Sequence, residues 1–161
     1  MFNLQRRQLL AALSASWLSV ALNKAAHAVT RVLPTSSSIK NDIEAALKTS
    51  KPLVVLVSLD NCPFCKIARE NYLIPLMAER AMSVIQVNTN HATPIDDALG
   101  KRTTHEQLIR AWAIKVTPTV LFLGKNGREV APRLEGGTTS DFYGAYLDER
   151  IRTAQAAIAR D

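Results

Sequence analysis

Two kinds of apolar pattern alternate along this chain: short continuous runs and longer stretches with helical spacing. Continuous runs occupy 53–59, which is rich in valine, and 120–123, and between them 82–87 is a mostly apolar run interrupted by Ser83 and Gln86. Runs of this length and composition are typical of strands buried on both faces. They predict the inner strands of a sheet, and the turn residues at 124–127 predict a hairpin into a fourth strand over about 129–134.

Amphipathic stretches between these runs predict helices. Ser38 is placed to cap a helix through about Lys48. A second helix begins around the Cys62-Pro63-Phe64-Cys65 segment and continues to about Arg80, with a kink at Pro75. The intervening strands and helices have the order of a β-α-β unit.

The second half of the chain is predicted to add a long polar loop and two more helices. The loop covers about 88–102, and the capping-box pattern of Thr103 and Glu106 starts a helix through about Ile114. After Gly136 and Gly137, either Thr138 or Thr139 is expected to cap a last helix to about Ala159. The residues of this helix predicted to face the core are Phe142, Tyr146, Leu147, Ile151 and Ile158.

The first 28 residues have the features of an export signal. Arg6 and Arg7 form a positive region, a run of 14 mostly apolar residues follows at 9–22, and Ala26-His27-Ala28 is a cleavage site of the A-x-A type. Cleavage after Ala28 leaves a single domain over 29–161. A membrane anchor is disfavoured because a spanning helix needs about 20 apolar residues. We therefore expect no stable membrane insertion after cleavage.

The type of export signal is left open between two alternatives. The stretch Arg6-Arg7-Gln8-Leu9-Leu10 resembles a twin-arginine signal, although Gln5 stands where such signals favour Ser or Thr. The alternative is a general secretory signal with two chance arginines.

The net charge gives little support to a nucleic-acid partner. The full chain carries 20 basic and 14 acidic residues, a formal net charge of +6. Arg6, Arg7 and Lys24 are the only charged residues of 1–28, so the mature chain has 17 basic and 14 acidic residues, or +3. A surplus this small, without an arginine-rich stripe, gives no reason to expect a nucleic-acid partner.

The two cysteines, Cys62 and Cys65, are the candidate chemistry of the chain. A disulfide between residues this close closes a very short loop and stabilises little, so a redox role is favoured over a structural one. The thiolate is the attacking form, and a helix N-terminus favours it. Cys62, just before the helix, is therefore the expected nucleophile, and Cys65 is expected to resolve the mixed disulfide.

Metal and haem chemistry fit the cysteines less well. Zinc takes four ligands, whereas one C-x-x-C supplies two, and no ligand spacing links His91 and His105 to it. Covalent haem attachment needs a histidine after the second cysteine, where this chain has Lys66. We expect no metal and no cofactor; a module that holds Cu(I) between the two thiolates stays as an alternative of another class.

Thr117-Pro118 precedes the third predicted strand. Proline cannot donate to a sheet ladder, so the first strand position suits it. The residues alone leave open whether the bond is cis, because most X-Pro bonds are trans.

Together these features resemble the thioredoxin superfamily over roughly 38–159. The resemblance rests on the strand at 53–59, on Cys62-Pro63-Phe64-Cys65, on Val116-Thr117-Pro118-Thr119 and on the glycine pair before the last helix. It implies an α/β thioredoxin fold, with a central mixed sheet of about four to five strands flanked by helices. It also implies that Pro118 is cis and lies beside the dithiol, and that the Thr117 backbone pairs with an extended substrate segment.

More narrowly, the chain looks like exported bacterial thioredoxin-like proteins that keep periplasmic thiols reduced, including those associated with sulfur-oxidation systems. This likeness implies a monomeric periplasmic reductase of protein disulfides, re-reduced by a membrane electron donor. A disulfide-donating oxidase or isomerase of the same fold is the alternative.

Three features of the sequence depart from the pattern of thioredoxin itself. Asn61 stands where thioredoxin has Trp, and Leu56 where it has a buried Asp that helps to deprotonate the inner cysteine. The pair Pro63-Phe64 is closer to a glutaredoxin Pro-Tyr, but the charged residues that would bind glutathione are not apparent.

Overall fold

The computed structural model describes residues 32–137 and 142–161. The predicted export signal, its cleavage site and the predicted helix cap at Thr138 or Thr139 lie outside the described residues. Among the helices of the described ranges, none has the length and apolar character needed to cross a membrane.

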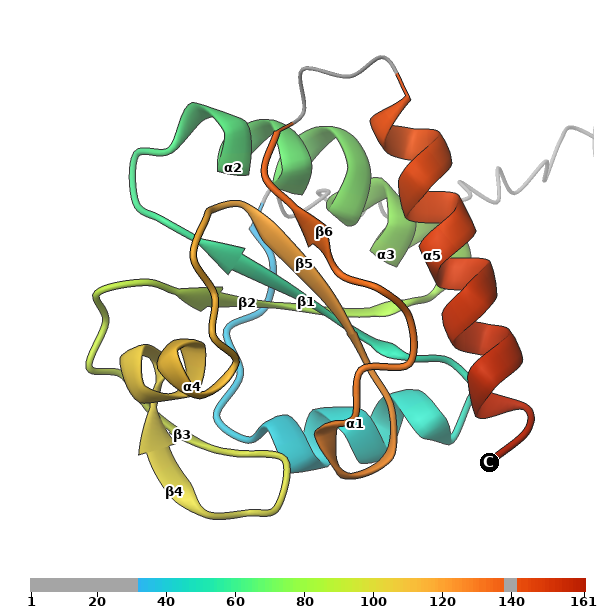
Figure 1. Ribbon diagram of the computed structural model, residues 1–161, viewed down its shortest axis with the longest axis horizontal. Helices are drawn as coiled ribbons and strands as arrows, with labels where there is room; N and C mark the ends of the chain where they lie inside the picture. Colours follow the sequence, from blue (N-terminus) through green and yellow to red (C-terminus); the bar gives the residue numbers. More distant parts are fainter. Residues whose placement is uncertain (1–31, 138–141) are drawn as a thin grey trace, which may run out of the picture.

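A mixed four-stranded sheet forms the centre of the fold, with strand order β2-β1-β5-β6 (Figure 1). β1 (Leu53–Ser58) pairs in parallel with β2 (Ser83–Asn88) and antiparallel with β5 (Thr119–Leu123). β5 in turn pairs antiparallel with the short β6 (Leu134–Glu135). Every residue of β1 and β5 is buried, as expected for strands covered on both faces. The predicted α/β class and mixed sheet are confirmed.

Helices lie against both faces of this sheet (Figure 1). Their bounds are α1 Ile39–Leu47, α2 Pro63–Ile67, the π-helical segment η1 Ala68–Leu73, α3 Ile74–Arg80, α4 His105–Ala111 and α5 Tyr143–Ile158, with a short 3₁₀ turn, η2, at Lys125–Gly127. α1 begins as predicted, because the Ser38 side chain accepts a hydrogen bond from the Asn41 N–H at 3.4 Å.

Alternate side chains of the strands build two hydrophobic cores, one on each face. Leu56 of β1 and Phe122 of β5 belong to the core that α3 and α5 cover. Val55 and Leu121, their neighbours in sequence, belong to the core covered by α1 and α4. This alternation is the period of two expected of strands, and it places Ser58, two residues after Leu56, on the same face as Leu56.

The predicted helix from Cys62 to Arg80 is present but changes its hydrogen-bonding pattern along its length. α2 passes into η1 and then into α3, which starts one residue before Pro75. Pro75 has no N–H to donate to the carbonyl four residues earlier, so the regular α-helical pattern cannot run through this position.

The prediction of a single polar loop over 88–102 is wrong. β3 (Pro94–Asp96) and β4 (Arg102–Thr104) form a second, two-stranded antiparallel sheet. The Asp97 carboxylate closes the turn between them, since its Oδ1 accepts from the N–H groups of Leu99 and Lys101 at 2.8 and 2.9 Å. Ile95, which is fully buried, ties this hairpin to the core under α1.

Thr103 is not the cap of the third helix, because it is part of β4. Thr104 takes that position, and its hydroxyl accepts from the Gln107 N–H at 3.3 Å. α4 also ends earlier than predicted, at Ala111, shortly before Ala113 with its positive φ of 53°.

The predicted strand over 129–134 is mostly absent. Only one bridge, from Leu123 to Glu129, follows the turn, and ladder pairing resumes at β6. Pro132 lies between these two points and has no N–H for a ladder, which separates them.

Two predictions for the last helix are wrong as well. Phe142 and Tyr146 are 65% and 52% exposed, whereas Leu147 and Ile151 are buried as expected. Ile158 packs, partly buried, against the same core. Tyr143 takes the buried position that the pattern assigned to its neighbour Phe142.

Candidate active site

β1 delivers the cysteine motif to one end of the sheet. The strand ends at Ser58, and a turn through Asn61, with φ of 57°, reverses the chain so that the Cys62 N–H reaches the Leu59 carbonyl at 3.4 Å. Pro63 then takes the first position of α2, where a missing N–H costs nothing. Cys62 is therefore the N-cap of the helix, as the sequence predicts.

The two thiols have different surroundings. The Cys65 N–H donates a hydrogen bond to Cys62 Sγ at 3.1 Å. Cys62 is partly exposed, whereas Cys65 is only 1% exposed, and both are free thiols. Only Cys62 is open to a disulfide of another molecule, while Cys65 lies beneath it in the first turn of α2.

The buried sulfur of Cys65 is balanced between opposing influences. Burial raises the pKa of the Cys65 thiol, and its hydrogen bond with Cys62 raises the pKa further. The Leu59 backbone and the Ser58 hydroxyl lower the pKa through hydrogen bonds to the sulfur. Burial is the largest effect, so Cys65 is held as a neutral thiol until a reaction step requires its thiolate.

Thr117 and Pro118 lie at the same end of the sheet. Thr119, the next residue, pairs with Val57 near the end of β1, so the segment before β5 and the segment after β1 share one edge. The Thr117–Pro118 peptide bond is cis, and the Pro118 carbonyl accepts from the Gly136 N–H at 2.8 Å. Within the described ranges, the Thr117 backbone has no hydrogen-bond partner.

Comparison with known proteins decides the family. A family model for the thioredoxin-like domain matches residues 39–151. The chain belongs to the thioredoxin-like domain family. No curated protein sequence gives a significant match to the chain.

Solved structures agree with this assignment at the level of the fold. A thioredoxin-fold protein from Helicobacter pylori aligns with a TM-score of 0.51 and 20% identity, covering 83% of this chain and 94% of its own. A protein described as DsbH oxidoreductase aligns with a TM-score of 0.50 and 18% identity, covering 78% of this chain and 85% of its own. At these identities the likeness shows the thioredoxin fold alone.

The position of the missing acid is filled by a core residue. Leu56 is fully buried in the core under α3 and α5. One step further along the same face, Ser58 is 1% exposed, and its hydroxyl donates to the Leu59 carbonyl at 3.5 Å and lowers the pKa of the Cys65 thiol. Sequence reasoning did not single out Ser58; the only available signal was a polar residue at the end of an otherwise apolar strand.

Tyr143 is a second residue near the dithiol that sequence reasoning missed. It is 4% exposed, its ring centroid lies 4.8 Å from that of Tyr72, and its hydroxyl has no hydrogen-bond partner among the described residues. Burial raises the pKa of Tyr143 to about 12, and the charges of Tyr72 and Cys65 add to this effect. The phenol therefore stays neutral throughout the working range of a thiol.

His91 and His105, the two histidines considered as metal ligands, each contact another residue instead. His91 Nε2 lies 2.8 Å from the Asp60 carboxylate. His105 is 1% exposed and accepts a hydrogen bond at Nδ1 from the Asn88 N–H at 3.3 Å. Burial, together with the charge of His91, lowers the pKa of His105. Across residues 32–137 and 142–161, no group of three or more His, Cys, Asp or Glu side chains is arranged to hold a metal.

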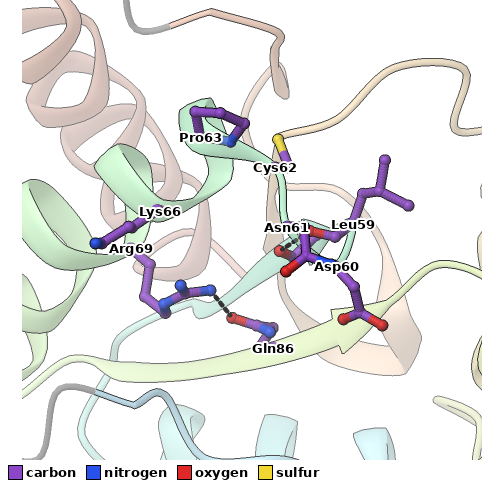
Figure 2. A pocket seen from close by; sticks show the side chains of 9 residues that line it. Leu59, Asp60, Asn61, Cys62, Pro63, Lys66, Arg69 and Gln86 are labelled. Carbon is purple, nitrogen blue, oxygen red and sulfur yellow. Dashed lines mark hydrogen bonds between the residues drawn. The ribbon is translucent and has the colours of Figure 1, made fainter.

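A polar cavity of about 430 Å³ opens beside Cys62 (Figure 2). Its walls are the loop after β1, the first turns of the helix that follows Cys62, and Gln86 of β2. Two cationic side chains, Lys66 and Arg69, lie on the helix side. We call this space the β2-side cavity.

Proposed function

We propose that this protein reduces disulfide bonds of other proteins through Cys62 and Cys65. The observation that carries the proposal is the arrangement of the two thiols. The sulfur of Cys62 is accessible at the start of α2 and accepts a hydrogen bond from the Cys65 N–H at 3.1 Å. The sulfur of Cys65 is buried beneath it. This arrangement separates an attacking thiol from a resolving thiol.

The reaction has two exchange steps. The Cys62 thiolate attacks one sulfur of the substrate disulfide; the substrate S–S bond breaks, and its electron pair leaves on the other sulfur as a thiolate that takes up a proton. Cys65 then loses its proton and attacks Cys62 Sγ, which forms the Cys62–Cys65 disulfide and releases the second substrate thiol. Two electrons pass to the substrate, and the protein ends oxidised.

Hydrogen bonds at Cys65 assist the second step. The Ser58 hydroxyl and the Leu59 backbone stabilise the negative charge that forms on this sulfur. They do part of the work of the buried acid that this chain lacks at Leu56.

The surface around Cys62 suits a polypeptide substrate. Leu59, Phe64 and Val116 are 40%, 45% and 45% exposed, and each lies within three residues of Cys62 or Pro118. Exposed apolar side chains of this kind favour contact with a partner. The Thr117 backbone, without a partner in the described part of the chain, offers hydrogen bonds to an extended substrate segment.

The reductive direction follows from the resemblance of the chain to exported thioredoxin-like proteins that keep periplasmic thiols reduced. The reduction potential of the Cys62–Cys65 pair tests this direction.

Export completes the proposal. We place the mature protein, starting at Val29, in the periplasm as a monomer, because 1–28 reads as a signal peptide. Since the compartment is oxidising, a reductase there needs a donor, and we assign re-reduction to a membrane electron carrier. N-terminal sequencing of the exported chain checks the start site: Val29 is expected, and an intact N-terminus would contradict it.

Trapping of the first intermediate tests the proposed function. In Cys65→Ser the second step is blocked, so we expect a stable mixed disulfide between Cys62 and a protein substrate. Cys62→Ser, the matched control, is expected to trap nothing and to lose at least about a hundredfold in turnover, since the nucleophile is gone. Equal trapping by both variants, or trapping only by Cys62→Ser, would contradict the assigned roles.

A further inference from the structure

The β2-side cavity lies on the side of the active site away from Pro118. Gln86 belongs to β2, and β2 and β5 flank β1 on opposite sides. A group bound here therefore does not compete with a substrate segment at Thr117. It still lies beside the attacking sulfur, because Cys62 is part of the cavity wall.

Arg69 is held in place with most of its donors unused. Its Nη1 donates to Gln86 Oε1 at 3.2 Å, and the amide of Gln86 is itself oriented by a 2.6 Å hydrogen bond from Nε2 to Asn88 Oδ1. The nearest carboxylate is that of Glu70, the next residue, at 3.9 Å from Nη2. A guanidinium fixed in this way suits a planar anion, which it binds through two parallel hydrogen bonds.

Lys66 adds a second positive charge to the same wall (Figure 2). It is exposed, and no carboxylate of the described chain lies within ion-pair distance of it. The cavity contains one acid, Asp60, which pairs with His91 at 2.8 Å and extends away from both cations (Figure 2). The helix side of the cavity thus carries two positive charges; Lys66 has no ion-pair partner in the described chain, and the only carboxylate paired with Arg69 there is Glu70 at 3.9 Å.

We propose that the β2-side cavity binds a carboxylate that a disulfide substrate carries close to the sulfur attacked by Cys62. The proposal rests on the proposed function and names the substrate class for it. The carboxylate comes either from a small acidic thiol or from an acidic residue beside a cysteine of a protein. In both cases Arg69 receives the carboxylate and Lys66 adds attraction at the rim.

Two small disulfides of nearly equal size isolate the effect. Dithiodiglycolate carries a carboxylate on each arm, and hydroxyethyl disulfide carries a hydroxyl instead. Each is mixed with the reduced protein, and the second-order rate of protein thiol loss is measured. The ratio of the two rates cancels changes in Cys62 reactivity, because both substrates meet the same sulfur.

Removal of either cation is expected to lower this ratio. We expect a drop of about fivefold for Arg69→Gln and about threefold for Lys66→Gln, as for charge-assisted contacts of partly exposed groups. Arg69→Lys keeps the positive charge but loses the pair of parallel hydrogen bonds that a guanidinium can donate. Its ratio is therefore expected between those of wild type and Arg69→Gln. Lys125→Gln, which makes the same change of net charge beyond the other end of β5, is the matched control and is expected to leave the ratio unchanged.

The outcomes separate the two proposals. Suppose that wild type reduces the neutral disulfide, but that the ratio of the two rates is the same in wild type, Arg69→Gln and Lys66→Gln. The proposed carboxylate site is then wrong, while the proposed reductase function is unaffected. A drop as large in Lys125→Gln would also overturn the site, since it would indicate long-range attraction alone. If wild type reduces neither disulfide, the proposed function itself fails.

Disulfide-linked peptides identify the source of the carboxylate. In one pair of peptides Asp flanks the reactive cysteine, and in the other pair Asn does. A preference for Asp that Arg69→Gln removes assigns the site to acidic protein substrates. A preference confined to dithiodiglycolate assigns it to small acidic thiols, and no preference in either series contradicts the proposal.

Discussion

At the residue scale, the behaviour of the dithiol depends on what surrounds the buried sulfur of Cys65. A thiolate formed in an apolar core needs hydrogen bonds, and thioredoxin-like proteins with a buried acid beneath the motif have an additional proton acceptor. This chain has Leu56 there, fully buried among apolar side chains. The hydroxyl of Ser58, on the same face of β1, is a side-chain group that lowers the pKa of Cys65.

Ser58→Ala tests this role. Loss of the hydroxyl is expected to raise the pKa of Cys65 further, because the hydroxyl is one of the groups that lower it. One hydrogen bond of this kind contributes about 1 kcal/mol, so the resolution of a mixed disulfide at neutral pH should slow about fivefold. The measurement is a single-turnover release of the second substrate thiol across a range of pH.

The control for this substitution keeps the hydroxyl. Ser58→Thr is expected to retain the pH midpoint of wild type, whereas the midpoint of Ser58→Ala moves to higher pH. A change confined to stability, with the same midpoint in all three proteins, would show that Ser58 is only a packing residue.

At the element scale, two neighbouring threonines at the start of α4 have different structural roles. Thr104 caps the helix through the Gln107 N–H, whereas the side chain of Thr103 donates to Gln107 Oε1 at 3.0 Å from its place in β4. Thr104→Ala should therefore lower the free energy of unfolding by about 1 kcal/mol. Thr103→Ala, one residue away, should change it by less than about 0.5 kcal/mol.

Urea unfolding of both variants checks this prediction. The larger loss in Thr104→Ala is the expected result. A larger loss in Thr103→Ala would restore the cap that the sequence pattern suggested and contradict the helix start described here.

Elements with a strong local pattern were predictable from the sequence. The valine-rich β1, the cap at Ser38 and the helix start at Cys62 each carry their cause within a few residues. β3 and β4 do not, because each is three residues long and depends on Asp97 closing the turn and on Ile95 reaching the core. Tyr143 is different, since it lies four residues before Leu147 and eight before Ile151, and helical spacing alone would have placed it, and not Phe142, on the buried face.

The candidate site likewise contains residues that the sequence could predict and residues that only the folded structure brings together. The motif is contiguous in sequence, from Cys62 through Pro63 and Phe64 to Cys65, so the sequence alone identifies it. Ser58, Arg69 and Gln86 come together only when β1, the helix after Cys62 and β2 are assembled, because residues distant in sequence then line one cavity.

At the scale of the whole molecule, stability depends on pH through His105. Its pKa is lowered in the folded protein by burial and by His91, while in the unfolded chain it lies near 6.5. Below about pH 6.5, His105 binds a proton in the unfolded chain but remains neutral in the folded protein until the pH reaches its lower folded pKa. The stabilising contribution is thus fully present above about pH 6.5 and is lost as the pH falls toward the folded pKa.

Unfolding at pH 7.5 and at pH 5.5 measures this contribution. We expect the free energy of unfolding to fall on acidification in wild type and to fall less in His105→Gln. His91→Gln, which removes the partly exposed histidine that pairs with Asp60, should keep most of the wild-type difference, because burial is the larger cause of the lowered pKa of His105. An equal fall in His105→Gln and wild type would show that other groups cause the pH dependence.

The direction of electron flow is also a property of the whole molecule, because it reflects the relative stability of the oxidised and reduced proteins. The measurement that tests it most directly is the reduction potential of the Cys62–Cys65 pair in the mature protein, by equilibration with glutathione or dithiothreitol. A reductase is expected to give a value near or below about −220 mV. A value near about −120 mV would contradict the account and make the protein a disulfide donor.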